Sequence, residues 1–92
     1  MKAQEKGIQE IKHYLTTDRI IIGSLETLKA LKQAQLETIY LASNCKPEIE
    51  ADIVQYSPLS GTQVVKLPVD NNDLGTSCKK PFSISVIGIK KG

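Results

Sequence analysis

Polar, charged and aromatic side chains gather in three segments that the sequence places at junctions between predicted strands and helices. The segments cover residues 23–29, 42–47 and 78–82. Junctions of this kind can meet at one edge of an α/β sheet, where helix N-termini offer backbone N–H groups to phosphates. That edge is the candidate site, and it would collect Glu26, Lys29, Asn44, Lys46, Lys79, Lys80 and Phe82.

These side chains supply an acceptor for a base edge, cations for phosphates and a flat apolar ring for stacking. Structured RNA is a ligand that uses all three. Other interpretations stay open at this point. Glu26 and Lys29 have the spacing of an exposed intrahelical ion pair. Phenylalanine is usually a core residue, so Phe82 can belong to the core, and Asn44 can hold its own loop through hydrogen bonds to the backbone. Lys79 and Lys80 also suit a solvated turn.

No combination of residues predicts catalysis or a cofactor. The single histidine, His13, has no serine or cysteine at a recognised spacing, and the carboxylate pairs lie on an exposed helix or in a helix cap. Neither GxGxxG nor GxxxxGK[ST] occurs. Cys45 and Cys78 lack partners at metal-ligand spacing, so we expect reduced thiols and no metal. The chain is therefore not predicted to be an enzyme or to bind a small-molecule substrate.

Hydrophobic spacing predicts helices and strands in alternation. The expected elements are a helix over residues 3–16, a strand over 20–22, a helix with Ser24 as N-cap, a strand over 38–42, a helix whose first turn holds Pro47, a strand over 63–67, a very short helix capped by residues 70–73 and a strand over 83–89. This order predicts an α/β fold, a three-layer α-β-α sandwich with a single four-stranded mixed sheet.

Length and composition bound the remaining possibilities. With 92 residues, of which 40% are hydrophobic, we expect one domain over residues 1–92 with a disordered tail at 90–92. The net charge of +2 does not indicate a nucleic-acid partner by itself. No apolar run has the length of a membrane span or the form of a secretory signal, so we expect a cytoplasmic protein without a membrane partner.

Three blocks of sequence resemble a known family. They are GSLETLK from Gly23, YLASNC from Tyr40 and NNDLGTSCKK from Asn71. Together they resemble the ribosomal-protein-thirty family of eukaryotic and archaeal large ribosomal subunits, a branch of the kink-turn-binding ribosomal-protein-seven-A superfamily. The resemblance extends from about Ile8 to Ile89. The NNDLGTSC block is its most specific part and points to this branch.

The resemblance implies a structural protein that binds a kink-turn or internal loop of ribosomal RNA and sits beside neighbouring large-subunit proteins in the cytoplasmic ribosome. It adds Gly23, Ser24 and Leu25 to the RNA-binding set. It implies that Gly23 allows close approach of RNA and that Glu26 reads a guanine edge beside Lys29. Asn44 matches a loop residue that faces RNA, and position 82 matches an aromatic residue that stacks on RNA.

Two positions depart from the family pattern. Leu25 stands where relatives place Asn or Lys, and Lys79 stands where they usually have Gly, so affinity for an isolated kink-turn is expected to be lower. Two alternatives to a ribosomal protein stay open. One is a kink-turn-binding core protein of a small nucleolar or other RNA–protein particle, and the other is a small α/β enzyme or a protein–protein adaptor.

Overall fold

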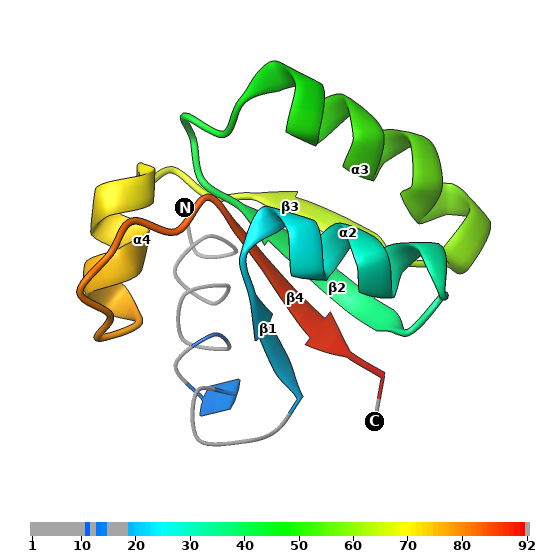
Figure 1. Cartoon of the computed structure of the whole chain (residues 1–92), viewed down its shortest axis with the longest axis horizontal. Coiled ribbons are helices and arrows are strands. Elements are labelled where there is room, and N and C mark those ends of the chain that lie inside the picture. Colours follow the sequence, from blue (N-terminus) through cyan, green and yellow to red (C-terminus); the bar gives the residue numbers. More distant parts are fainter. Residues whose placement is uncertain (1–10, 12, 15–18, 92) are drawn as a thin grey trace.

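A computed structural model describes residues 11, 13, 14 and 19–91 of the chain (Figure 1). Ile11, His13 and Tyr14 are helical, and the rest of the predicted helix over residues 3–16 lies outside the described residues. The elements that follow are β1 (Ile20–Ile22), α2 (Ser24–Lys32), β2 (Leu36–Leu41), α3 (Pro47–Ser60), β3 (Gln63–Lys66), α4 (Asn71–Ser77) and β4 (Val86–Lys90).

The strands form one mixed sheet in the order β1-β4-β2-β3. β4 runs antiparallel to both of its neighbours, β1 and β2, whereas β2 and β3 are parallel and are joined by α3. A parallel pair needs a long crossover connection, and the helix over Pro47–Ser60 supplies it. The predicted four-stranded mixed sheet is confirmed.

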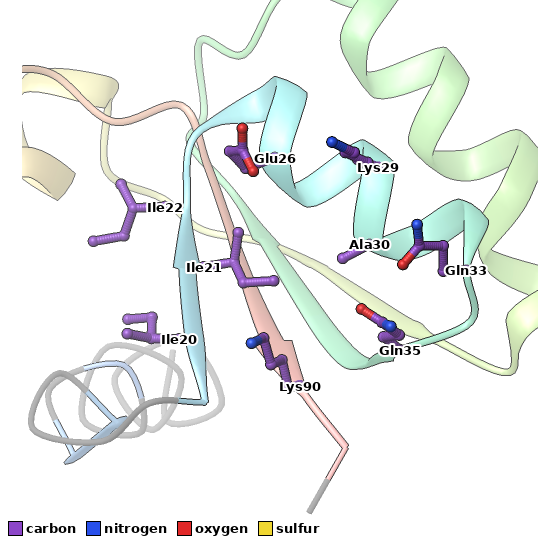
Figure 2. Close-up of a pocket in the computed structure, with 9 residues that line it drawn as sticks. All are labelled: Ile20, Ile21, Ile22, Glu26, Lys29, Ala30, Gln33, Gln35 and Lys90. Atoms are coloured by element: carbon purple, nitrogen blue, oxygen red, sulfur yellow. The ribbon is translucent and has the colours of Figure 1, made fainter.

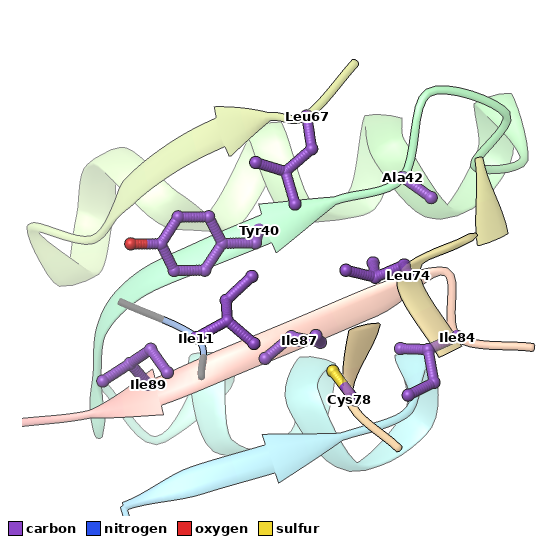
Figure 3. Close-up of a cluster of buried hydrophobic side chains, with 9 residues drawn as sticks. All are labelled: Ile11, Tyr40, Ala42, Leu67, Leu74, Cys78, Ile84, Ile87 and Ile89. Carbon is purple, nitrogen blue, oxygen red and sulfur yellow. The ribbon is translucent and has the colours of Figure 1, made fainter. Parts of the chain in front are cut away.

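Helices cover both faces of the sheet. α2 and α3 lie on one face, where Leu31, Ile39 and Ile53 are among the buried residues (Figure 1). On the other face, a second cluster includes Ile11, Tyr40, Leu74, Cys78 and Ile87 (Figure 3). Neighbouring residues Ile39 and Tyr40 belong to different clusters because strand side chains alternate between faces. The three-layer α-β-α sandwich is therefore confirmed.

Several boundaries differ from those predicted. β2 begins at Leu36, two residues earlier than expected, and its pairing with β4 is irregular between Leu36 and Thr38. β4 begins at Val86 rather than at residue 83, because the backbone N–H of Ile84 donates to the carbonyl of Asn71 on α4 (3.0 Å). Residues 83–85 are therefore a loop that is held by the short helix.

Two further expectations were wrong. Ser24 is not the N-cap of α2: that position belongs to Gly23, and no side chain caps the helix. The expected tail at 90–92 is also too long, because Lys90 ends β4 and the backbone N–H of Lys91 donates to the carbonyl of Gln35 (2.9 Å). Tertiary hydrogen bonds thus extend order to Lys91. In contrast, Asp70 caps α4 as predicted, accepting a hydrogen bond from the backbone N–H of Asp73 (2.8 Å).

Candidate nucleic-acid interface

The three predicted junctions meet at one end of the sheet. The backbone N–H of Gly23, after β1, donates to the carbonyl of Val86 at the start of β4 (3.0 Å). The N–H of Ala42, after β2, donates to the carbonyl of Ser85 just before it (2.9 Å). The loop between α4 and β4 therefore lies between the ends of two strands, beside the start of α2 (Figure 1).

Gly23 leaves space for a ligand at this end of the sheet. Its φ of +113° is disfavoured for any residue with a side chain, and a Cβ built there would meet nothing within 4 Å. Glycine is thus required by the backbone conformation, and the space above it is open. Because no side chain caps α2, the first backbone N–H groups of that helix are left for a ligand or for water.

A shallow hollow joins two of the junctions. It has a volume of about 460 Å³ and is lined by Ile22, Gly23, Ser24, Lys80, Phe82, Ser83, Ile84 and Ser85. The Phe82 side chain is 55% exposed, so the interpretation of this residue as part of the core is wrong. An exposed phenylalanine beside a lysine and a helix N-terminus can stack on a flat ring whose phosphate is held nearby.

The loop that carries Phe82 is packed tightly against α4. Gly75 lies against the backbone carbonyl of Phe82, and a Cβ at position 75 would overlap it. At the start of this loop Lys79 has φ +58°, in the left-handed region that favours glycine. The lysine at this position therefore adopts a backbone conformation that residues with a side chain rarely take. Lys79 is exposed and does not line the hollow.

Glu26 and Lys29 lie on α2 around a different hollow (Figure 2). This hollow, of about 430 Å³, lies between α2 and β1 and also includes Ala30, Gln33, Gln35 and Lys90. Both side chains are exposed, and they form no ion pair with one another. The alternative of an intrahelical pair is therefore wrong, and both groups are available to a ligand. Leu25, on the same helix, is 81% exposed.

The amide of Asn44 is engaged within the protein. Its Nδ2 donates to Oδ1 of Asn71 (3.0 Å), and its Oδ1 accepts from the backbone N–H of Asn71 (2.9 Å). Because the carbonyl of Asn71 in turn holds Ile84, Asn44 positions the loop that carries Phe82. Lys46 is exposed at the N-cap of α3. Neither Asn44 nor Lys46 lines one of the two hollows.

Sequence reasoning missed Ser83 and Ser85, which line the hollow with Phe82. It assigned them to a strand, although the alternation of these serines with the buried Ile84 already indicated that both side chains point away from the core. Asn71, the partner of Asn44, was expected only as part of a helix cap and of the NNDLGTSCKK block, with no role in holding Asn44. Its link to Asn44 crosses 27 positions of sequence and had no local signal.

Both cysteines are free and buried. Burial raises the pKa of the Cys45 thiol, with a smaller contribution in the same direction from Glu50, and burial also raises the pKa of the Cys78 thiol. The described residues contain no group of three or more histidine, cysteine or acidic side chains placed to hold a metal. In the described part of the chain, no helix is long and apolar enough to cross a membrane.

Comparison with known proteins identifies relatives over most of the chain. A family model described as the ribosomal protein L7Ae/L30e/S12e/Gadd45 family matches residues 5–92. The large ribosomal subunit protein eL30 of Sulfurisphaera tokodaii is 34% identical over 80 residues, which cover 87% of this chain and 76% of the relative. The eL30 protein of Methanosphaera stadtmanae is 33% identical over 87 residues, covering 95% and 86% respectively.

A solved structure shows the same fold. The Giardia lamblia 15.5kD RNA binding protein superposes with a TM-score of 0.88 at 22% identity, covering 100% of this chain and 77% of that one. The proteins named eL30 are ribosomal proteins, which supports the prediction that this chain is not an enzyme.

Proposed function

The chain belongs to the ribosomal protein L7Ae/L30e/S12e/Gadd45 family, and from this we propose that it is an eL30-type structural protein of the large ribosomal subunit that binds a kink-turn of ribosomal RNA. Its partners would be ribosomal RNA and adjacent large-subunit proteins, in the cytoplasmic ribosome. The observation that carries the RNA-binding proposal is the exposed Phe82, which shares a hollow with Gly23, Ser24 and Lys80.

Each group at this end of the molecule has a role that suits RNA. Phe82 would stack on an unpaired base, and Lys80 and the N-terminus of α2 would hold adjacent phosphates. Phosphates repel a carboxylate near RNA, and hydrogen bonds that the carboxylate accepts from a base can offset this repulsion. Glu26 would therefore read the N–H groups of a guanine edge, with Lys29 holding a phosphate beside it.

The remaining members of the set would act at the margin of the interface. Lys46 and Lys79, both exposed, would add phosphate contacts that depend on salt. Leu25 would give apolar contact with a base or sugar where relatives place a polar side chain. Asn44 would act mainly by positioning, because its oxygen and one N–H are used by Asn71.

Binding to a kink-turn RNA tests the proposal directly. In a gel-shift at moderate salt, the protein should bind the kink-turn more tightly than the same RNA with its sheared G·A pairs converted to Watson–Crick pairs. Equal affinity for both would contradict it, because phosphate contacts alone do not distinguish bases. Sedimentation of the endogenous protein with the large subunit would separate the ribosomal role from the alternative, a core protein of a small nucleolar or other RNA–protein particle.

A further inference from the structure

β1 lies at the edge of the sheet, and no other strand in the described part of the chain pairs with its outer side. The backbone N–H of Lys90 donates to the carbonyl of Arg19 (2.7 Å), and the N–H of Gly23 donates to that of Val86 (3.0 Å). Backbone groups in an antiparallel pair point alternately toward and away from the partner strand. The N–H and C=O groups of Ile20 and Ile22 therefore point away from β4. No hydrogen bond joins them to another residue in the described part of the chain.

The protection of this edge rests on the shortness of β1, which has three residues. Natural proteins commonly place a charged side chain, a proline or a bulge in such a strand. β1 instead consists of three isoleucines, and its register with β4 is regular from Ile20 to Ile22. Its shortness limits a partner strand to the backbone groups of Ile20 and Ile22. Specificity would therefore depend on the surfaces beside the strand.

Two hollows lie beside the edge, and Ile22 lines both of them. Figure 2 shows that Ile21 is directed beneath α2, whereas Ile20 and Ile22 are directed to the other side of the strand. Because side chains of a strand alternate between faces, an added strand would place one residue beside Ile21 in the hollow under α2. Its two neighbours would lie beside Ile20 and Ile22.

We propose that β1 accepts an extended segment of another protein as an additional strand, which goes beyond the proposed RNA-binding function. Alternating backbone donors and acceptors at strand spacing are matched by another polypeptide and not by RNA. The residues opposite Ile20 and Ile22 would be apolar. The residue opposite Ile21 would be acidic, because the hollow under α2 contains Lys29 and Lys90 against the single carboxylate of Glu26.

The charges also argue against a second copy of this chain as the partner. Pairing of β1 with itself would bring together two hollows that each contain Lys29 and Lys90. Like charges that face each other across an interface oppose association, whereas an acidic segment would be attracted to the lysines. The partner is therefore a different chain with an apolar-acidic-apolar pattern.

Amide hydrogen exchange of the full chain, followed by NMR, tests the proposal with a defined probe. The probe is the peptide acetyl-Thr-Val-Glu-Val-Thr-amide at saturating concentration. We expect exchange at the amides of Ile20 and Ile22 to slow by about tenfold, with little change at Ile21, whose N–H already faces β4. Methylating both valine nitrogens of the peptide, which removes the two N–H donors that lie opposite Ile20 and Ile22, should abolish this effect while leaving the protein unaltered. Replacing its glutamate by lysine should weaken binding.

Variants of Ile20, at the end of β1 away from the hollow around Phe82, provide the matched comparison. Ile20→Pro removes an outward N–H and should lose peptide binding, whereas Ile20→Val keeps it and should retain binding. Both should still bind kink-turn RNA, so that failure of this proposal and failure of RNA binding are distinguishable. Absence of protection at Ile20 and Ile22 overturns the proposal. So does protection that grows with protein concentration alone, which would indicate self-pairing, or protection produced by RNA in place of the peptide.

Discussion

The exposure of Phe82 predicts how its replacement affects folding stability and RNA affinity. Replacing it with alanine should leave the free energy of unfolding almost unchanged, because over half of the side chain is exposed. It should reduce RNA affinity by about 1–3 kcal/mol through the loss of stacking. Binding titrations and thermal melts of Phe82→Ala measure the two effects separately.

Ile84 provides the matched control for Phe82. It lies two residues further along the same loop but is 2% exposed, so Ile84→Ala should destabilise the fold by about 2–5 kcal/mol. A loss of stability for Phe82→Ala as large as that for Ile84→Ala, with unchanged RNA binding, would contradict the proposed interface.

At the scale of elements, the link between the 42–47 loop and α4 determines where Phe82 is held. Asn44→Ala removes both hydrogen bonds to Asn71, whose carbonyl holds Ile84. Because these groups are exposed, we expect a loss of about 1 kcal/mol in unfolding free energy. RNA affinity should fall as well, since the loop that carries Phe82 is positioned less firmly. Chemical denaturation and RNA titration measure the two changes.

Asn72 is the matched control for this link. It is exposed and next to Asn71, and the Thr76 hydroxyl bonds to its backbone carbonyl, which mutation of the side chain leaves in place. Asn72→Ala should therefore affect stability and RNA binding less than Asn44→Ala. Equal effects of the two substitutions would mean that the link between Asn44 and Asn71 does not position the loop.

At the scale of the whole molecule, the two thiols report on burial on opposite faces of the sheet. Cys45 belongs to the cluster beneath α2 and α3, and Cys78 belongs to the other cluster. Burial raises both pKa values, so the folded chain holds these protons to a higher pH than the unfolded chain does. Their contribution to stability is complete below about pH 8.5 and is lost as the pH rises through the folded-state pKa values.

Denaturation curves between neutral pH and pH 10 measure this loss. The double variant Cys45→Ala and Cys78→Ala should show a smaller decrease in stability with rising pH, although its stability at neutral pH will be lower. An equal decrease in both proteins would show that other groups are responsible. Mass spectrometry of protein purified from its source cells should find both thiols reduced, and a disulfide there would contradict the assignment.

Over residues 19–91, the sequence by itself determined the order and type of the elements, because each depends on local patterns. The isoleucine run at 20–22 and the proline in the first turn of α3 were sufficient to place those elements correctly. Asp70 marked the start of α4 because its side chain bonds to a backbone N–H only three residues away. The family was also identifiable from sequence, because the blocks that resemble it are contiguous stretches of the chain, and the family model matches residues 5–92.

Only the tertiary structure decided how the site residues are distributed. Glu26 and Lys29 line the hollow between α2 and β1. Lys80 and Phe82 line the other hollow, beside the 78–85 loop, which is held against α4. The engagement of Asn44 with Asn71 and the open edge of β1 depend on segments far apart in the sequence. Local periodicity does not encode such contacts, because they arise when the sheet brings distant backbone groups together.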